Sequence, residues 1–308
     1  MRVALTRLYR AVAARPRLAA LLGAVCIAAS GVLYRFADVT PETASFFRCF
    51  YGLPLLVLAA AIERRQVGRL PARGRWLAAF AGLLFAADLI FWHHSIDAVG
   101  AGLATVLGNL QVVFVAIAAW LLFGERPTPR TLASLPVILF GIVLIAGVIG
   151  AGTYGADPPL GVALGILTGL AYAGYLIVIR QVGRGRSAEP VAISTASTAV
   201  VALVVGLLLG RIDLVPSWPA HGWLIVLGVT AQSAGYLLIS ISLPRLPAVV
   251  TSIILLAQPV MSVLLAMALV GETPSLAQLA GVGLVIGGIA LATVPLRGFR
   301  RRALPATP

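Results

Sequence analysis

The sequence contains no lysine, only two cysteines and three histidines, and 11% charged residues over its 308 positions. Without lysine it has no Gly-Lys-Ser/Thr phosphate-binding loop, which excludes an ATP-driven pump that works by itself. The His-Glu-x-x-His and Gly-x-Ser-x-Gly patterns of zinc peptidases and serine hydrolases are also missing. Cys26 and Cys49 both lie in long apolar segments, so we interpret them as small core residues and not as a disulfide. We expect neither a cofactor nor a metal ion.

Charge is scarce here by the standard of soluble proteins, in which about 25% of residues are charged. The chain is 60% hydrophobic, and its mean hydropathy is +1.02. A membrane span needs about 20 mostly apolar residues, and a helix satisfies its own backbone polar groups in lipid. The sequence therefore predicts an all-α membrane protein with ten transmembrane helices, at 18–37, 43–62, 76–96, 98–122, 131–150, 159–180, 190–210, 220–242, 246–270 and 275–295.

The positive charge is arranged by topology. All 23 basic residues are arginines, and 20 of them fall in cytoplasmic segments if the N-terminus is cytoplasmic. This matches the positive-inside rule and predicts an inner-membrane protein with both termini in the cytoplasm and the lipid bilayer as its partner. The net charge of +13 is thereby explained without any nucleic-acid role. Several acidic residues fall outside instead: Asp38, Glu42, Asp97, Asp157, Asp213 and Glu272.

About fifty residues occur twice without a gap, since 98–147 returns at 245–294, 147 positions later. Gln111 aligns with Gln258, and Gly141 aligns with Gly288. Each half contains five spans, an odd number, so the second half enters the membrane from the opposite side as an inverted repeat. We expect a basic cytoplasmic N-terminus at 1–17, a first five-helix repeat at 18–150, a second at 151–296, and a basic cytoplasmic tail at 297–308.

Three motifs make the chain resemble a known family. Gly-Glu-x-Pro follows the fourth span at 124–127 and the ninth at 271–274, Pro41 is followed by Arg48, and the sixth span contains the run 171–175, Ala-Tyr-Ala-Gly-Tyr. With ten spans in two inverted repeats, the chain resembles the EamA-like branch of the drug/metabolite transporter superfamily. The resemblance implies a multi-pass transporter of small metabolites, often outward, with a central cavity.

One position departs from the family pattern. The proline that the family often has in the middle of the fourth span is Pro259 in the second repeat but Val112 in the first. The pattern therefore predicts a helix break at this depth in the second repeat and leaves it open in the first. In the second, Pro259 would free a backbone carbonyl for the cavity.

Asp88 and Arg48 are ionisable residues inside predicted spans, where a charge costs roughly 2.5–3.5 kcal/mol and persists only with a partner or a function. Both lie in the outer half of the membrane, on adjacent helices. Asp88 could carry a proton or bind an amine, and Arg48 could bind a carboxylate. The alternative is that the two form an ion pair with a purely structural role. Asp88 aligns with Gly235, and this asymmetry favours a function for Asp88.

His93 and His94 follow Asp88 near the external end of the third span. Histidine titrates near neutral pH, so a proton relay with Asp88 is one hypothesis. A histidine pair at the membrane interface, capping the helix end, is the more ordinary interpretation. Together with Asp97 they are too close in sequence to converge on a metal ion, so we predict no metal site.

Gln111 and Gln258 lie about twelve residues into their spans, near the bilayer midplane, where inverted-repeat transporters bind substrate. An amide hydrogen bond between helices is the structural alternative. Asn109 is about 200° from Gln111 on an ideal helix, so we expect that the two cannot both face one cavity fully. Gln232 and Ser233 in the eighth span are weaker polar candidates of the same kind. Trp92, Tyr172, Tyr175 and Tyr236 are candidates for an aromatic pocket wall.

In the Gly-Glu-x-Pro loops, glycine can end one helix, proline can open the next and glutamate can cap its N-terminus. We therefore interpret Glu125 and Glu272 as structural capping residues.

These observations favour a secondary transporter that exports or exchanges small amphipathic metabolites such as amino acids or amines by alternating access. Proton coupling and a homodimer are left open. The alternatives from other classes are an intramembrane enzyme built on the histidines or Asp88, and a membrane partner protein that transports nothing.

Overall fold

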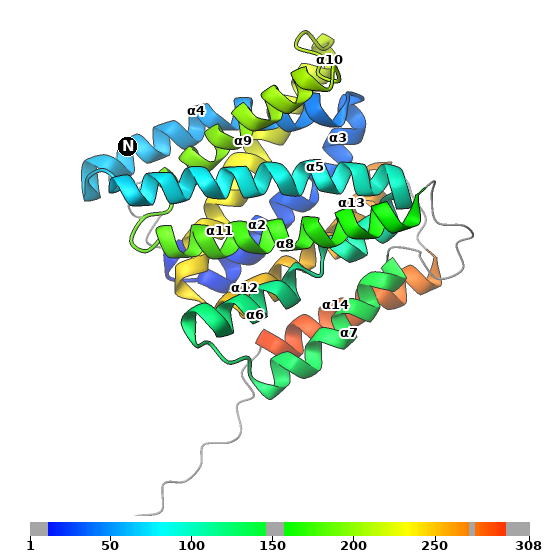
Figure 1. The fold of residues 1–308 in the computed structure, drawn as a ribbon. Helices are drawn as coiled ribbons and strands as arrows, with labels where there is room; N and C mark the ends of the chain where they lie inside the picture. Colours follow the sequence, from blue (N-terminus) through cyan, green and yellow to red (C-terminus); the bar gives the residue numbers. More distant parts are fainter. Residues whose placement is uncertain (1–11, 146–156, 271–274, 294–308) are drawn as a thin grey trace, which may run out of the picture.

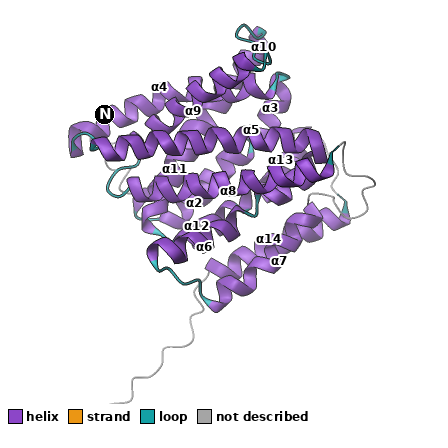
Figure 2. Cartoon of the chain, in the orientation of Figure 1, coloured by secondary structure: helices purple, strands orange, loops and turns teal. Residues whose placement is uncertain are grey.

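The computed structural model describes residues 12–145, 157–270 and 275–293, which form helices joined by short connections (Figure 1 and Figure 2). Gly271 and Glu272 fall outside these residues. The first half contains α2 (Pro16–Ala28), α3 (Ser30–Ala37), α4 (Pro41–Val67), α5 (Ala72–Gly108), α6 (Gln111–Phe123) and α7 (Pro129–Ile145). The second half contains α8 (Pro158–Val182), α9 (Ala188–Leu208), α10 (Trp218–Leu227), the π-helix η1 (Gly228–Gly235), α11 (Tyr236–Ser242), η2 (Leu243–Arg245), α12 (Ala248–Leu255), α13 (Ala257–Val270) and α14 (Leu276–Thr293).

The ten predicted spans are confirmed as helices. Among the described residues, eight stretches are long and apolar enough to cross a membrane, and two shorter apolar helices, Pro129–Ile145 and Leu276–Ala292, make up the remaining pair. Many large apolar side chains on the outside of the bundle are exposed, among them Leu121, Leu208 and Leu276. Such a surface suits lipid and would be costly in water.

Helix α5 contains a reversal of the chain. A straight helix of its 37 residues would be about 55 Å long and would hold Trp92 and Gly108 about 24 Å apart. Instead, a Cβ atom built on Gly108 would lie 3.9 Å from Cδ1 of Trp92. The chain therefore doubles back between these two residues, within the range of α5. The predicted third and fourth spans are both present, but no break in secondary structure separates them.

Both repeats have a helix break at the same position. Helix α5 gives way to α6 at Asn109 and Leu110, and α12 gives way to α13 at Leu256, which is 147 residues after Asn109. The break that the sequence left open in the first repeat is thus present without proline. Helix α8 packs closely against this break, since a Cβ atom on Gly169 would lie 3.1 Å from the backbone nitrogen of Gln111.

Equivalent helices of the two repeats pack against each other, α4 against α9 and α7 against α14. The pair α7 and α14 forms one edge of the bundle in Figure 1. A Cβ atom on Gly141 would lie 2.8 Å from the carbonyl oxygen of Gly281. The repeat-equivalent contact exists too, since a Cβ atom on Gly288 would lie 3.5 Å from the carbonyl oxygen of Ser134. These reciprocal contacts indicate a pseudo-two-fold axis between the repeats.

Ion pairs fix one end of the bundle. The buried carboxylate of Glu189 at the start of α9 pairs with Arg64 of α4 at 2.8 Å and with Arg186 at 3.3 Å. Glu63 accepts hydrogen bonds from three backbone N–H groups at the start of α9, which complements the positive end of that helix dipole. We call this end, which also carries Arg180, the basic end.

Candidate functional site

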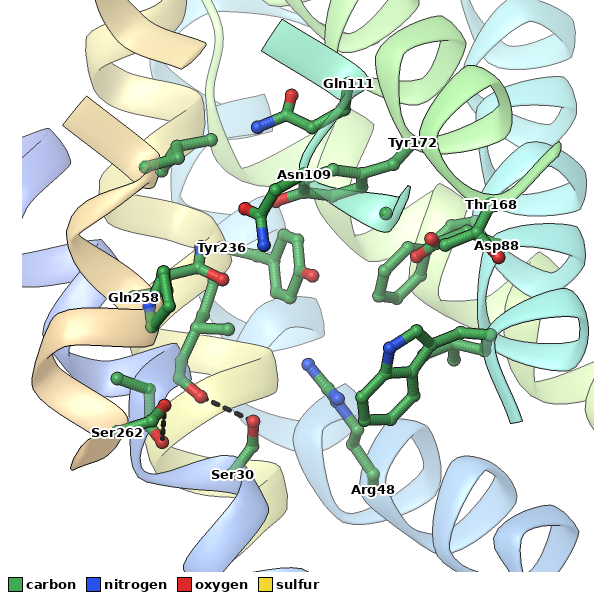
Figure 3. Close-up of a pocket in the computed structure, with 18 residues that line it drawn as sticks. Ser30, Arg48, Asp88, Asn109, Gln111, Thr168, Tyr172, Tyr236, Gln258 and Ser262 are labelled. Atoms are coloured by element: carbon green, nitrogen blue, oxygen red, sulfur yellow. Dashed lines mark hydrogen bonds between the residues drawn. The ribbon is translucent and has the colours of Figure 1, made fainter. Parts of the chain in front are cut away.

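A cavity of about 330 Å³ lies inside the bundle, with walls from α2, α3, α4, α5, α6, α8, α11, α12 and α13 and from the connection between α5 and α6 (Figure 3). It brings together polar side chains from distant parts of the sequence. Among the predicted site residues, those that line it include Arg48, Asp88, Trp92, Asn109, Gln111, Tyr172, Tyr236 and Gln258.

Arg48 reaches the cavity from α4. Its Nε atom donates a hydrogen bond of 2.9 Å to Oε1 of Gln232, and its guanidinium carbon lies 5.8 Å from the ring centre of Phe85 and 5.7 Å from that of Tyr236. These are distances at which an aromatic face attracts a cation. Neither terminal nitrogen of Arg48 has a hydrogen-bond partner among the described residues, so both remain available to a ligand.

Asp88 enters the cavity from α5, on the same side as Thr168 of α8 in Figure 3. The three ion pairs between described residues all lie at the basic end, and none involves Asp88 or Arg48. The two charges face one cavity but do not form the direct ion pair that a structural role would require. A cation and an anion in a membrane cavity, each without an ion-pair partner within 4.0 Å among the described residues, suit a ligand that carries both charges.

Gln111 and Gln258 project from α6 and α13 into the cavity, and Thr168 projects from α8. Oε1 of Gln111, Nε2 of Gln258 and Oγ1 of Thr168 are buried and have no hydrogen-bond partner among the described residues. An unpaired buried polar group costs about 1–3 kcal/mol of stability. Three such groups around one cavity are therefore unusual unless a ligand or water supplies the missing hydrogen bonds. The two glutamines do not bond to each other, so the amide bridge between helices is not formed.

The prediction that Asn109 and Gln111 cannot share a cavity was wrong. It assumed an unbroken helix, but α5 ends at Gly108 and α6 begins at Gln111. The N–H of Leu110 bonds to the carbonyl of Leu107 at 3.1 Å, which is the tighter i to i+3 pattern. This local change of rotation turns both polar side chains toward the same space (Figure 3).

Aromatic rings form the wall toward the basic end. Tyr172 lines the cavity, and its ring stacks on that of Tyr175 with centres 6.0 Å apart. Tyr175 itself is 2% exposed and packs behind the wall, 5.0 Å from Phe85 and 5.8 Å from Tyr236. The hydroxyl of Tyr172 is directed toward Tyr236 and Gln258, but it closes no hydrogen bond of normal geometry.

His94 is not among the residues that line the cavity. His94 lies in α5 and is partly exposed, while the side chain of His93 is outside the described part of the structure. Among the described residues, no three His, Cys, Asp or Glu side chains are grouped as a metal ion would need. The arrangement offers binding groups of both charges.

Comparison with known proteins identifies the chain. The model of the EamA-like transporter family matches residues 16–147 and again 159–294. The chain belongs to the EamA-like transporter family. This family is a non-enzymatic one within the drug/metabolite transporter superfamily, so the alternative of an intramembrane enzyme is wrong, and the protein is a multi-pass membrane transporter.

The relatives of this EamA-like protein agree with the assignment. It is 32% identical to an uncharacterized protein of Pseudomonas aeruginosa over 298 residues, 94% of this chain and 98% of the other. It is 28% identical over 275 residues, 89% of this chain and 94% of the other, to an uncharacterized transporter of Archaeoglobus fulgidus. A crystal structure that is 20% identical covers 91% of this chain and 96% of its own with a TM-score of 0.79, which supports the fold.

In this EamA-like protein, the glutamate of the first Gly-Glu-x-Pro loop caps a helix other than the one predicted. Oε2 of Glu125 accepts from the backbone nitrogen of Ala248 at 3.1 Å, at the start of α12, and Oε1 accepts from Nη2 of Arg180 at 2.5 Å. The start of α7 is capped instead by Thr128, whose Oγ1 accepts from the backbone nitrogen of Thr131. The prediction named the wrong helix because this contact joins the two repeats and is not local.

Arg180 completes this clamp at the basic end. Its Nε donates to the carbonyl of Leu243 at 3.2 Å and its Nη2 to that of Leu246 at 3.3 Å, while its guanidinium carbon lies 5.0 Å from the ring centre of Phe123. One side chain of α8 thus holds the loop after α6 and the connection before α12. Between this clamp and the cavity, most residues of α8 are buried, among them Tyr175, Leu176 and Ile179.

Sequence reasoning missed several cavity residues, among them Ser30, Phe85, Thr168 and Ser262. Ser262 could have been found, because it follows Gln258 by four residues and so shares its helix face. Its hydroxyl donates to the carbonyl of Ala28 at 3.1 Å, next to the break between α2 and α3. Ser30, Phe85 and Thr168 carry no comparable signal, since each is a single common residue in an apolar helix.

Proposed function

We propose that this EamA-like transporter is a secondary carrier of small zwitterionic or cationic amphipathic solutes, with amino acids and amines as its substrate classes. It would export or exchange them by alternating access. The observation that carries the proposal is the pairing of Asp88 and Arg48 in one cavity, each without an ion pair among the described residues. In this proposal Asp88 binds an ammonium group or carries a proton, and Arg48 binds a carboxylate.

The size and lining of the cavity support the same substrate class. A volume of about 330 Å³ is at the small end of the range for metabolite sites, which are mostly apolar with a few placed polar groups. Phe85, Leu89, Trp92 and Tyr236 supply apolar wall, and Gln111 and Gln258 supply unpaired amides. A small molecule with charged ends and an apolar part would contact all of these.

We further propose an orientation. By the positive-inside rule the basic end faces the cytoplasm, which places both termini there in an inner membrane. The cavity then lies in the external half, and the clamp of Glu125 and Arg180 closes the cytoplasmic side. Opening of that clamp would be the step that exposes the cavity to the cytoplasm.

The test is counterflow uptake by the purified protein in proteoliposomes, with labelled amino acids, amines and nucleosides, with and without a pH gradient. Wild type is compared with Asp88→Asn, and Asp213→Asn serves as a matched control outside the cavity. The side chain of Asp213 accepts a hydrogen bond from the backbone nitrogen of Val215, and the amide oxygen of asparagine can accept the same bond. We expect saturable uptake of amino acids or amines that Asp88→Asn loses or uncouples from the pH gradient, with Asp213→Asn like wild type.

Two results would contradict the proposal in different ways. Unchanged pH dependence and uptake in Asp88→Asn would remove Asp88 from the mechanism. Folded wild-type protein that takes up none of the three substrate classes would overturn the proposed substrate classes.

A further inference from the structure

A chain of hydrogen bonds lies behind Arg48, on the side away from the cavity. Nε of Arg48 donates to Oε1 of Gln232 at 2.9 Å, and Nε2 of Gln232 donates to Oγ1 of Thr195 at 2.9 Å. Gln232 and Thr195 are each 1% exposed. Since the Nε–H of arginine can only donate, it must meet the oxygen of the amide, and this fixes which way the amide points. Thr195 then holds the amide in that direction.

Gln232 is also held through its backbone and stem. It lies in the π-helix η1, and a Cβ atom on Gly52 of α4 would be 2.9 Å from its Cγ, so no larger residue fits between them. The next residue, Ser233, donates from its hydroxyl to the carbonyl of Gly52 at 2.9 Å. A short π-helical segment inside an α-helical span is a frequent feature of functional sites. The segment is therefore anchored directly to the helix that carries Arg48.

The remaining sides of the guanidinium are also occupied. The ring centres of Phe85 and Tyr236 lie 5.8 Å and 5.7 Å from its central carbon. With Nε bonded and two aromatic rings beside the group, the edge formed by the two terminal nitrogens is directed into the cavity (Figure 3). Two parallel N–H groups on such an edge match the two oxygens of a carboxylate, provided that the guanidinium is held in orientation.

The repeat explains how this arrangement is built. Arg48 and Thr195 are 147 residues apart and so occupy equivalent positions, and Phe85 and Gln232 are equivalent in the same way. The four residues form one cluster where α4 and α9 pack together near the pseudo-two-fold axis. The first repeat supplies a cation and a ring, and the second supplies the amide and hydroxyl that orient the cation. Symmetric packing of the two repeats would not by itself require that one repeat supplies the cation and the other supplies the groups that orient it.

We propose that Gln232, anchored by Thr195, is a positioning residue that aims the terminal nitrogens of Arg48 into the cavity and thereby sets the preference for substrates with a carboxylate. This inference rests on the proposed function for its substrate class, but the geometry of Arg48 can be tested without transport. Gln232 does not touch the substrate in this scheme, and it acts only through Arg48.

The transport test compares an amino acid with the amine that lacks its carboxylate. The variants are Gln232→Leu, which removes the acceptor at similar size, and Thr195→Val, which removes only the anchor. Thr195→Ser keeps the hydroxyl, and Thr198→Val is the matched control one turn along α9, where the hydroxyl bonds to the carbonyls of Gly82 and Ser194. Gln232→Leu and Thr195→Val should raise KM for the amino acid roughly tenfold or more, the scale of a lost bond to a charged group, and leave KM for the amine unchanged.

A merely structural role would not give this pattern. The positioning role is overturned if Thr195→Val raises KM for the amino acid and KM for the amine by the same factor. It is also overturned if Thr195→Ser does not keep the wild-type ratio of the two KM values. Thr198→Val should leave that ratio unchanged, and a changed ratio in this control would also contradict the proposal.

The second measurement needs no substrate. In protein labelled with nitrogen-15 arginine, the Nε proton of Arg48, assigned with Arg48→Lys, should be protected from exchange in wild type and Thr195→Ser. It should lose protection in Gln232→Leu and Thr195→Val. An unprotected proton in wild type, or equal protection in all variants, would refute the positioning. If protection follows this pattern while wild type transports neither compound, the positioning stands and the proposed substrate class fails.

Discussion

Removing the carboxylate of Glu125 should release the clamp at the basic end. This side chain accepts from Arg180 at 2.5 Å and from the backbone nitrogen of Ala248 at 3.1 Å, so it joins the loop after α6 to α8 and to α12. For the cavity to open at the basic end, these three elements must separate. Both interactions are then lost, and their strength contributes to the free-energy difference between the closed state and the open state.

The size of the effect follows from the two contacts. A hydrogen bond to a charged group contributes about 1.5–3 kcal/mol, and a side-chain acceptor at a helix start about 0.5–2 kcal/mol. Because the side chain of Glu125 is 30% exposed, solvent screens the ion pair and the lower part of the combined range applies, about 2–3 kcal/mol. At about 1.4 kcal/mol for each tenfold change, Glu125→Ala should shift the equilibrium toward the open state roughly thirty- to hundredfold.

The assay is the rate of modification of a single cysteine between cavity and clamp. Val115 in α6 is 1% exposed and follows Gln111 by four residues, so it lies on the same helix face, one turn nearer the basic end. In a background with Cys26→Ala and Cys49→Ala, Val115→Cys should react slowly with a small charged thiol reagent added from the cytoplasmic side. Adding Glu125→Ala should raise that rate by the factor derived above.

The control is the same change at another acidic residue, Glu42→Ala, in the first turn of α4 and far along that helix from Arg64. An unchanged rate with Glu125→Ala in folded protein would refute the reasoning, because the clamp would then contribute nothing to closure. An equal increase with Glu42→Ala would do the same, because the effect would reflect general loosening of the bundle.

Two further predictions concern packing and the unpaired amides. Gly82→Ala should destabilise the protein by about 1–3 kcal/mol, because its Cβ atom would lie 2.2 Å from the carbonyl oxygen of Ser194, whereas Gly283→Ala, with nothing within 4 Å, should not. Thermal unfolding in detergent measures both, and equal melting temperatures for the two variants would contradict the close contact of α5 and α9. Gln111→Leu and Gln258→Leu should leave thermal stability unchanged or higher while raising the substrate KM, since each removes a buried polar atom without a hydrogen-bond partner among the described residues. A clear loss of stability in either variant would show that the amide has a structural partner.

The fold could be predicted because the features that determine it, apolar runs and an internal repeat, can be read along the sequence. Spans follow from runs of apolar residues, and the repeat follows from aligned pairs such as Gln111 and Gln258. The depth of Arg48 and Asp88 could also be estimated by counting from the helix ends, and both line the cavity. Depth along a helix is a local property of the sequence, so these residues were accessible to sequence reasoning.

Contacts between helices were beyond such reasoning. Arg48 could have faced Asp88, yet its hydrogen-bond partner is Gln232, 184 residues away in a π-helical segment that no periodicity predicts. Asn109 was misjudged because the helical wheel assumes a regular helix, and the wheel fails at the break before Gln111. Glu125 was assigned to the wrong helix because its partners come from the other repeat. In each case the missing quantity is the rotation or approach of a second helix.

Some features are shared by both repeats and others belong to one repeat alone, and this difference bears on how the transporter works. The helix breaks, the glycine contacts of α7 with α14 and the paired glutamines are shared by both repeats, as expected for a framework that exchanges two similar arrangements. The charges are not shared, since Arg48 has Thr195 as its equivalent and Asp88 has Gly235. Both charges belong to α4 and α5 of the first repeat, so they would keep their relative places if the repeats move as units. A zwitterion bound between them would then travel with α4 and α5 and with Gln232, which is hydrogen-bonded to Arg48.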